Sequence, residues 1–293
     1  MRRFGTSLFL TAYGLYKART AFERFVPTGL RFRESANAYE ILLNYATERN
    51  HAMTPALSVI VPVKDEAENV TSLAREIAAA VAGSGPAEII FVDDGSSDAT
   101  AERLIQLRSD IPGLRVIQHG ANAGQSRAVR TGVRAARAAI MVTLDGDGQN
   151  DPADIPQLLA VFREAGPELG LVAGVRRRRQ DTLSKRWASR FANGLRNWLL
   201  NDGASDTGCG LKAFRREAFL ALPYFDHIHR YLITLMLREG YEVRYVDVAH
   251  RARAHGTSKY GVWDRALVGI SDLLGVRWLQ RRFRGGAIET REL

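Results

Sequence analysis

The chain has 293 residues, of which 46% are hydrophobic and 25% are charged, which is ordinary for a globular protein. Cys209 is the single cysteine, so an intrachain disulfide framework is excluded and a reducing compartment is suitable. The net charge of +9 predicts an anionic partner, which composition alone leaves open between nucleic acid, a membrane surface and phosphorylated substrates.

The N-terminal residues form a separate segment in the sequence pattern. They begin Met-Arg-Arg and continue into an apolar stretch, residues 4–16, that lacks a small-residue cleavage site. The stretch is also shorter than the roughly 20 apolar residues that a membrane-spanning helix needs. We therefore expect residues 1–52 to be a helical or partly disordered extension, and we predict no transmembrane segment anywhere in the chain.

From residue 57 onward, short apolar β-branched runs alternate with helical stretches. Predicted strands cover residues 57–63, 88–92, 114–118, 140–144 and 169–175. Predicted helices cover residues 67–82, 99–108, 125–138 and 153–165, and Asp98 and Asp151 are candidate N-caps. Continuous apolar runs are typical of strands buried on both faces. The alternation predicts an α/β fold with a parallel, doubly wound sheet.

The second half of the chain is predicted to be mainly helical. Helices are expected over 184–200, 215–222 and 231–239, a strand over 242–248, and a long amphipathic helix over 263–283. One side of the last helix is apolar and is bordered by Arg265, Arg277, Arg281 and Arg282. The apolar side comprises Trp263, Leu267, Ile270, Leu274, Trp278 and Leu279. Two explanations remain open for it, namely packing on the core or binding in the plane of an anionic membrane.

Acidic residues follow three of the predicted parallel strands. The first strand ends in PVKDE (62–66), the second in DDGS (93–96) and the fourth in DGDGQ (145–149). Ligands of open α/β sheets bind at the carboxyl ends of the strands, so these clusters should face one site. No G-x-G-x-x-G follows the first strand and no Walker A sequence is present, which argues against dinucleotide and P-loop classes.

The third cluster carries the most specific chemistry. Asp145 and Asp147 are separated by one residue, so both carboxylates can be directed to one site. Hard oxygen ligands suit Mg²⁺ or Mn²⁺, which would neutralise a departing pyrophosphate. Gly146 would let the backbone approach the ligand closely. The alternative is a plain Asp/Gly turn that begins the next helix.

The stretches VPVKDE, VDDGSSD and LDGDGQNDP, in this order and spacing, resemble the family 2 inverting glycosyltransferases. These enzymes have the GT-A fold, a Rossmann-like, doubly wound and mostly parallel sheet. The closer similarity is to the branch of dolichol-phosphate mannose synthases and polyprenyl-phosphate glycosyltransferases. Three further stretches support that branch, SDTGCGLKAFRREAF (205–219), FDHIHRYL (225–232) and HRARAHGTSKYG (250–261). The resemblance implies a catalytic domain over residues 53–262, followed by the amphipathic helix and tail, 263–293.

The resemblance also implies roles for individual residues. The metal and the donor pyrophosphate would be held by Asp145, Asp147 and Gln149. The donor pocket would be lined by Pro62, Val63, Asp65, Glu66, Asp93, Asp94 and Gly146. The acceptor phosphate would contact Arg186, Ser189, Arg230, Arg253, Ser258 and Lys259, of which Arg253 and Lys259 are also expected to act in catalysis. The sequence departs from the branch at Cys209-Gly210-Leu211, where many members read S-G-F.

The implied reaction is the transfer of a hexose from a UDP- or GDP-hexose to a polyprenyl phosphate, with inversion. An acceptor phosphate, with a second pKa near 6, is already largely a dianion and needs no general base. A hydroxyl acceptor would need one. Asp206 is a candidate base or a structural contact, and His227 and His229 are assigned positioning roles because their spacing of two is unusual for a metal pair.

Two rival functions remain open. One is the same fold acting on a saccharide hydroxyl in cell-envelope polysaccharide synthesis. The other is a binder of nucleotide sugars or nucleic acid without enzymatic activity. The acidic clusters repel a phosphate backbone, and no aromatic residues interleave with the basic runs, so a nucleic-acid partner is not expected. Many branch members continue into transmembrane helices, whereas this chain is expected to lie on the cytoplasmic face of an anionic membrane.

Overall fold

The computed structural model describes residues 54–176, 194, 196–204, 206–252 and 262–283, with only the backbone described over 262–268. The chain divides into two units, Met1–Met53 and Thr54–Leu293, and every described residue belongs to the second unit. The predicted extension, residues 1–52, therefore lies outside the described residues.

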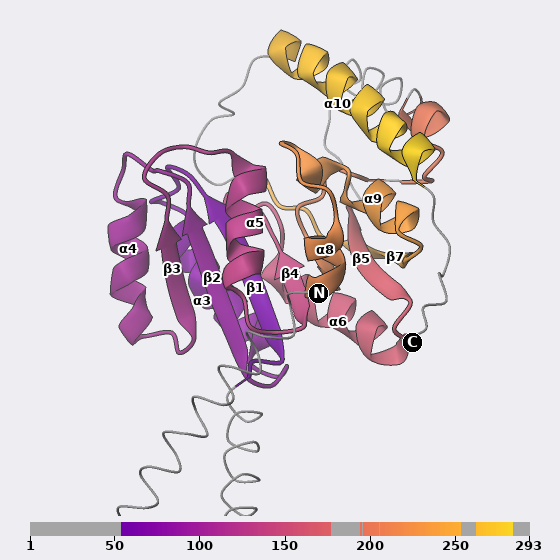
Figure 1. The fold of residues 1–293 in the computed structure, drawn as a ribbon. Coiled ribbons are helices and arrows are strands. Elements are labelled where there is room, and N and C mark those ends of the chain that lie inside the picture. The colour runs from indigo at the N-terminus through magenta and orange to yellow at the C-terminus, as the bar shows by residue number, and fades with distance from the viewer. Residues whose placement is uncertain (1–53, 177–193, 195, 205, 253–261, 284–293) are drawn as a thin grey trace, which may run out of the picture. The chain divides into compact units, whose positions relative to one another are not determined.

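One mixed sheet of seven strands organises the described part of the chain (Figure 1). Its spatial order is β3-β2-β1-β4-β6-β5-β7. β6 runs antiparallel to both neighbours, while the other pairings are parallel. The strands are β1 (Leu57–Val63), β2 (Ala87–Asp93), β3 (Leu114–Gln118), β4 (Ile140–Thr143), β5 (Leu169–Arg176), β6 (Lys212–Arg215) and β7 (Glu242–Val248).

Helices connect the strands and cover both faces of the sheet. The α-helices are α3 (Val70–Val81), α4 (Thr100–Gln106), α5 (Gln125–Ala135), α6 (Ile155–Glu164), α8 (Arg216–Ala221), α9 (Leu232–Arg238) and α10 (Val262–Arg282). Short 3₁₀ turns are η1 (Leu107–Ser109), η2 (Pro152–Asp154) and η3 (Ile228–Arg230). Figure 1 shows α3 and α5 on opposite faces of the strands β1 and β2.

Alternate residues of the central strands enter two hydrophobic cores. Val59 and Val61 of β1 join a core with α3, α4 and α6, whereas Ile60 joins a core with α5, α8, α9 and α10. All three side chains are fully buried. Since successive side chains of a strand point to opposite faces, continuous apolar runs are needed where both faces are covered. The predicted α/β class and doubly wound sheet are thereby confirmed.

The predicted strands agree with the observed ones to within one or two residues, but β6 was not predicted. Its four residues, Lys212–Arg215, begin and end with a cation, and so lack the apolar run of a buried strand. Lys212 is nevertheless only 5% exposed. Of the predicted helix 184–200, the described residues 194 and 196–200 are helical and the remainder lies outside the described part.

The two candidate caps differ in structure. Asp151 is the N-cap of η2, and its side chain accepts a hydrogen bond from Ala153 N over 3.0 Å, as predicted. Asp98 precedes the cap position of α4 by one residue, and its carboxylate also accepts from Ala67 N over 3.1 Å. Asp98 therefore links the loops that follow β1 and β2 besides beginning a helix.

α10 packs on the sheet domain mainly through residues outside the predicted apolar side, although Leu279 of that side is partly buried against the second core. Leu273 and Val276 are buried in the second core. Gln280 Nε2 donates to Leu200 O over 2.9 Å, and Arg238 Nε donates to Leu279 O over 3.1 Å. The helix is thus anchored by two buried aliphatic side chains and by hydrogen bonds at its carboxyl-terminal end.

Candidate active site

The carboxyl ends of β1, β2 and β4 bring the predicted acidic loops to one edge of the sheet. Asp94 N donates to Val63 O over 2.8 Å, which joins the first and second loops. Leu144 N donates to Ile60 O over 3.4 Å, which continues the pairing of β4 with β1 to the start of the third loop. Parallel strands therefore place the three clusters together, as the sequence predicted.

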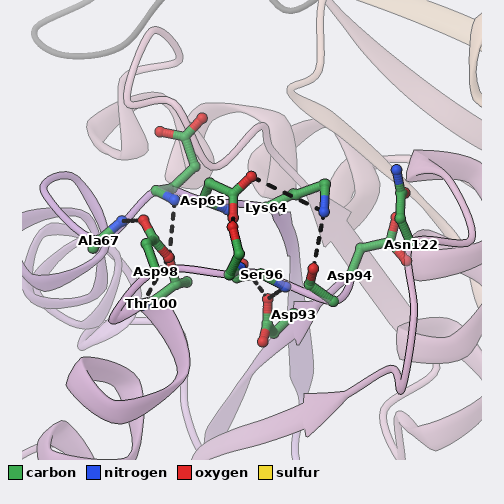
Figure 2. A network of polar contacts seen from close by, with 12 residues as sticks. Lys64, Asp65, Ala67, Asp93, Asp94, Ser96, Asp98, Thr100 and Asn122 are labelled. Carbon is green, nitrogen blue, oxygen red and sulfur yellow. Dashed lines mark hydrogen bonds and ion pairs between the residues drawn. The ribbon is translucent and has the colours of Figure 1, made fainter.

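The loop after β1 is held by the loop after β2 (Figure 2). Lys64 Nζ donates to Gly95 O over 2.9 Å, and Asp65 N donates to Ser96 Oγ over 2.8 Å. The Asp65 carboxylate accepts from Ser97 N over 2.7 Å. Asp65 has a φ of 49°, a left-handed conformation that non-glycine residues seldom adopt. These hydrogen bonds stabilise the strained backbone and fix the loop.

Glu66 and Asp98 extend the same network, part of which Figure 2 shows. Glu66 N donates to Thr100 Oγ1 over 2.9 Å. Asp98 accepts from Ala67 N and from Thr100 N over 3.1 and 3.0 Å. Burial opposes ionisation of the Asp98 carboxyl, but the hydrogen bonds from Thr100 and Ala67 outweigh it and lower its pKa. Asp98 is therefore a structural carboxylate.

Asp93 is completely buried, and both of its carboxylate oxygens are hydrogen bonded to protein groups. One oxygen accepts from Ser96 N over 3.0 Å and also from the Ser96 hydroxyl. The other oxygen accepts from Gln118 Nε2 over 2.9 Å. Asp93 thus fixes the turn after β2 and ties it to β3.

Asp94 holds the loop that leads into α5. Its two oxygens accept from Ala123 N and Gly124 N over 2.9 and 2.8 Å, and one also contacts His119 Nδ1 at 2.7 Å. Gly124 has a φ of 88°, which favours glycine at this position. The predicted contact of Asp93 and Asp94 with the nucleoside remains a prediction, and the contacts observed are with protein.

The third loop carries Asp145 at the wall of a cavity. Asp145 Oδ1 accepts from Gln125 Nε2 over 2.7 Å, and Asp145 N donates to Asn150 Oδ1 over 3.2 Å. Burial raises the pKa of the Asp145 carboxyl, and the negative charge of Asp147 raises it further. Asp147 Oδ1 accepts from Gln149 N over 3.1 Å, which folds the loop back on itself.

Two glycines keep this loop in place. A Cβ on Gly146 would lie 2.5 Å from Val63 Cγ1 and 2.9 Å from Pro62 O. The close approach that requires Gly146 is therefore to the β1 loop. A Cβ on Gly210 would lie 2.3 to 2.7 Å from the carboxylate atoms of Asp145. Gly210 is held there by its carbonyl, which accepts from Thr143 Oγ1 over 3.1 Å.

A cavity of about 290 Å³ opens beside Asp145. It is lined by parts of β4 and β6 and by the start of α5, the 207–210 turn and η3. The polar side chains on its wall include Gln125, Asp145, Thr207, Lys212, His229 and Arg230. Pro62 also lines it, whereas the Val63 side chain belongs to the first core. The cavity has the size and mixed polarity of a small-molecule site.

Lys212 places a buried cation next to the acidic loop. Its Nζ donates to Cys209 O, and burial lowers the pKa of the ammonium group. Cys209 is buried as well, and burial raises the pKa of its thiol. Cys209 therefore serves as a small core residue, in agreement with the buried role that sequence reasoning gives a lone cysteine.

Asp206 is engaged in an ion pair at the end of β5. Arg176 Nε and a terminal guanidinium nitrogen of Arg176 each lie 2.7 Å from an Asp206 oxygen. Arg176 N also donates to Asp206, over 3.3 Å. This bidentate geometry is typical of a strong structural pair. It favours the structural alternative for Asp206 over a general base.

η3 and its N-cap position carry two histidines with different contacts, His229 and His227. His227 Nδ1 lies 2.9 Å from Asp272 Oδ2 of α10, and His229 Nδ1 lies 2.7 Å from Ser126 Oγ of α5. Burial, reinforced by the positive charge of Arg230, lowers the pKa of His229 to about 3. His229 is therefore neutral at physiological pH.

Arg230 is the predicted acceptor-phosphate residue that the structure brings to the cavity. No hydrogen bond or ion pair of its guanidinium occurs within the described ranges, whereas Arg176 and Arg196 are paired with carboxylates. A cation at a cavity wall without a carboxylate partner is suited to bind an anion. The other predicted phosphate contacts, Arg186, Ser189, Arg253, Ser258 and Lys259, lie outside the described residues.

The residues that lead from β7 to Arg253 are hydrogen bonded to the third loop. Asn150 and His250 form an antiparallel bridge, and Arg251 N donates to Gln149 O over 2.9 Å. Arg251 is also paired with Glu76 at 2.5 Å. The residues that precede Arg253 are therefore attached to the sheet domain directly beside the acidic loop.

The residues present fit a divalent cation that a substrate helps to bind. Within the described ranges, no cluster of three or more His, Cys, Asp or Glu side chains could hold a metal by itself. Asp145 and Asp147 offer two carboxylates, and among the described residues no hydrogen bond engages the side-chain amide of Gln149. One or two carboxylates with substrate phosphates are the usual ligands of Mg²⁺ in such sites.

Sequence reasoning missed Gln125, Ser126 and Lys212 as site residues. The signal for the first two is Gly124 immediately before an apolar helical pattern, which marks a helix that starts at the ligand edge. The signal for Lys212 is its place two residues after Gly210 in the GCGLKAF stretch. Gln125 and Lys212 meet Asp145 or its cavity, and Ser126 meets His229, only because distant segments fold together.

A sheet of this topology, with acidic loops at its carboxyl edge and a polar cavity beside them, is the arrangement that the resemblance to GT-A glycosyltransferases predicts. A family model described as Glycosyl transferase family 2 matches residues 58–222. The chain belongs to this family of glycosyltransferases, as the sequence resemblance predicted.

Curated relatives give a finer comparison. The dodecaprenyl-phosphate galacturonate synthase of Rhizobium johnstonii is 34% identical over 77% of this chain and 67% of its own length. The undecaprenyl-phosphate 4-deoxy-4-formamido-L-arabinose transferase of Pseudomonas aeruginosa is 37% identical over 70% of this chain. The chain spans 60% of the length of the second relative.

A solved structure supports the fold. Glucosyl-3-phosphoglycerate synthase of Mycobacterium tuberculosis, in complex with Mn²⁺, UDP-glucose and phosphoglyceric acid, superposes with a TM-score of 0.58. It is 19% identical and covers 77% of this chain and 79% of its own. The GT-A expectation is confirmed by this match.

Proposed function

We propose that the protein transfers a hexose from a UDP- or GDP-hexose to a polyprenyl phosphate, with inversion at the anomeric carbon. The observation that carries the proposal is that Asp145 and Arg230 line the same cavity. Asp145 provides a carboxylate for the metal and the nucleotide-sugar donor, and Arg230 provides an unpaired cation for an acceptor phosphate. Relatives of 34% and 37% identity are named for transfer to dodecaprenyl and undecaprenyl phosphate.

On the donor side, Asp145, Asp147 and Gln149 would hold Mg²⁺ or Mn²⁺. When bound, the cation would neutralise the charge that grows on the nucleoside diphosphate as it leaves. Gln125 orients Asp145 through its 2.7 Å hydrogen bond. Lys212 adds a positive charge behind the same carboxylate. These contacts hold the carboxylate before the donor arrives, so little reorganisation is needed.

The reaction is a single displacement. An oxygen of the acceptor phosphate forms a bond with the anomeric carbon from the face opposite the leaving group. The bond between that carbon and the diphosphate oxygen breaks, and its electron pair leaves with the nucleoside diphosphate. Arg230 would hold the acceptor phosphate, with its guanidinium donating to oxygens that do not react.

The alternative of a saccharide hydroxyl acceptor requires a general base at the cavity. His229 has a pKa of about 3 and is too weak a base for a hydroxyl proton. Asp206 is held by Arg176 in a bidentate pair. A phosphate acceptor, which carries its own negative charge, needs neither residue as a base.

The direct test is a transfer assay with the full chain. Radiolabelled UDP- and GDP-hexoses are offered with undecaprenyl phosphate or with an oligosaccharide, in Mg²⁺, Mn²⁺ or EDTA. We expect label in the lipid fraction that depends on the divalent cation. Transfer to the saccharide while undecaprenyl phosphate stays unlabelled would refute the proposed acceptor.

The substitution Arg230→Met tests the acceptor side. A hydrogen bond to a charged group contributes about 1.5–3 kcal/mol, so KM for undecaprenyl phosphate should rise roughly 10- to 100-fold. KM for the nucleotide sugar should change little. Initial rates at varied acceptor concentration measure the effect, and Arg230→Lys should give an intermediate value.

The matched control is Arg163→Met, which removes the same charge from an exposed position on α6. It should leave both KM values unchanged. An equal rise of KM for donor and acceptor in Arg230→Met would contradict a role confined to the acceptor phosphate.

We further propose that α10 attaches the protein to an anionic membrane. Among the described residues, no helix combines the length and the apolarity that crossing a membrane requires. Ile270, Leu274 and Trp278 recur every four residues on α10 and are 54%, 58% and 59% exposed. Arg281 and Arg282 are exposed beside them. These three residues of the predicted apolar side are therefore exposed, whereas Leu279 of the same side is partly buried against the second core.

The triple substitution Ile270→Ser, Leu274→Ser and Trp278→Ser should weaken binding to phosphatidylglycerol vesicles by on the order of tenfold or more, because it removes apolar area that a bilayer would bury. Co-sedimentation with the vesicles measures this change. Binding to phosphatidylcholine should be weaker for both proteins.

The control for vesicle binding is Ile105→Ser on α4, which changes an isoleucine of similar exposure, 55%, outside α10. Vesicle binding of this variant should equal that of the unsubstituted protein. Full binding by the triple variant would assign membrane attachment to another part of the chain.

A further inference from the structure

His229 differs from His119, the other partly buried histidine near the site, in how its ring nitrogens are used. His119 has both nitrogens engaged, with Asp94 at 2.7 Å and Thr131 at 3.0 Å. His229 has one nitrogen engaged, Nδ1, at 2.7 Å from Ser126 Oγ. A histidine that only stabilises a fold usually satisfies both nitrogens when buried. His229 therefore retains one hydrogen-bonding group for another partner.

The second nitrogen of His229 is accessible from the cavity. In the described part of the chain, the buried side-chain atoms without a partner are His250 Nδ1 and Gln280 Oε1. His229 Nε2 is not one of them, although no hydrogen bond engages it. The ring lines the cavity together with Asp145 and Arg230. A ligand in the cavity can thus reach Nε2.

Ser126 fixes the orientation of the ring. Ser126 is fully buried in the first turn of α5 and follows Gln125, which holds Asp145. α5 therefore positions the carboxylate and the imidazole through consecutive residues. This arrangement relates the two groups rigidly to each other, as a site for one small molecule requires.

We propose that His229 Nε2 hydrogen bonds a hydroxyl group of the transferred sugar and so selects among hexose donors. This inference rests on the proposed nucleotide-sugar function. The Ser126 hydroxyl either donates to Nδ1, leaving Nε2–H as a donor, or accepts from Nδ1–H, leaving Nε2 as an acceptor. A sugar hydroxyl both donates and accepts, so it complements either tautomer.

The chemistry of the other cavity ligands fits His229 less well. A phosphate dianion is bound best by a cation, and the neighbouring Arg230 supplies one. The imidazole is neutral at physiological pH, as its pKa of about 3 shows. A neutral, oriented hydrogen-bonding group is the usual means of recognising a hydroxyl, because the mismatched ligand leaves a buried polar group unpaired.

The test is donor binding to the full chain, measured by titration calorimetry with Mg²⁺. Each nucleotide sugar is compared with its nucleoside diphosphate, so that the contribution of the sugar is isolated. His229→Asn keeps a polar group near Ser126 but does not reach the Nε2 position, whereas His229→Gln does. We expect His229→Asn to weaken nucleotide-sugar binding about tenfold, with binding of the diphosphate unchanged. His229→Gln should restore much of the loss.

The control is His227→Asn, two residues away, whose ring contacts Asp272 of α10 and does not line the cavity. It should leave the contribution of the sugar unchanged. Thermal unfolding of each variant verifies that the fold is kept. If His229→Asn binds the nucleotide sugar as tightly as the unsubstituted protein, the inference is overturned. If the unsubstituted protein binds no nucleotide sugar, the proposed function itself fails.

Deoxygenated donors identify the hydroxyl. Removal of the hydroxyl that contacts His229 should weaken binding to the unsubstituted protein but should not weaken it further in His229→Asn. Hydroxyls elsewhere on the ring should give additive losses. Additive losses at every ring position would overturn the proposed contact.

Discussion

Replacing Asp145 by asparagine should lower kcat roughly 100- to 1000-fold, the loss seen when one group that stabilises developing charge is removed. Asparagine retains an oxygen that can accept from Gln125 Nε2, as Asp145 Oδ1 does at 2.7 Å. It removes the negative charge with which Asp145 and Asp147 would hold a divalent cation. Steady-state transfer at saturating donor and Mg²⁺ measures the loss, and raising the Mg²⁺ concentration should recover little.

The same substitution should not destabilise the fold. Burial raises the pKa of the Asp145 carboxyl in the folded protein above its value in the unfolded chain. As the pH rises from the unfolded pKa toward the folded pKa, the free energy of unfolding therefore falls. That loss of stability is present above the unfolded pKa, and asparagine does not ionise. In EDTA at pH 7, the thermal midpoint of Asp145→Asn should therefore equal or exceed that of the unsubstituted protein.

Asp110→Asn is the matched control, because Asp110 contacts Ser109 on an exposed turn away from the cavity. Its activity and its thermal midpoint should stay unchanged. Activity of Asp145→Asn within threefold of the unsubstituted protein would contradict the donor-side role assigned to Asp145.

Gly210→Ala should reduce kcat roughly 100-fold, although only one methyl group is added. The new Cβ would lie 2.3 to 2.7 Å from the Asp145 carboxylate, so that side chain must turn away. The carboxylate is the free end of a side chain, and its displacement costs the fold little. A displacement of about 1 Å at a reacting group nevertheless lowers rates by about 100-fold. Activity assays and thermal unfolding of the same preparation separate the two effects.

Gly83→Ala is the control for this substitution, since a Cβ at Gly83 meets nothing within 4 Å. It should preserve kcat. A large fall in the thermal midpoint of Gly210→Ala, in proportion to its loss of activity, would show that Gly210 supports the fold and not the geometry of Asp145.

The sequence pattern was sufficient for the strands that contain a β-branched apolar run. Residues 57–63 and 114–118 were predicted with the bounds that the structure has for β1 and β3. β6 was missed because its pairing with β4 and β5 depends on partners more than 35 residues away, and its lysine is buried near Asp145 and Asp206. Neither the strand partners of β6 nor the buried surroundings of its lysine can be inferred from local secondary-structure propensity.

The site could be predicted where functional side chains come directly after a strand in the sequence, as Asp145 and Asp147 do. Residues such as Ser126 and His229 could not be paired from sequence, because 103 positions separate them. The C-terminal helix shows a similar limit. Its exposed residues Ile270 and Leu274 were identified, but Leu273 and Val276, which anchor it, became evident only from packing.

The reversed strand β6 also has a consequence for the order in which the protein folds. β1, β2, β3 and β4 come from one continuous stretch, residues 57–143, and can pair as they are synthesised. β5 cannot join them until residues 212–215 have emerged, because β6 lies between β4 and β5. During synthesis, β4 therefore remains an open sheet edge while about 70 further residues are added. This edge, next to the acidic loop, is where a nascent chain of this fold is most exposed to aggregation.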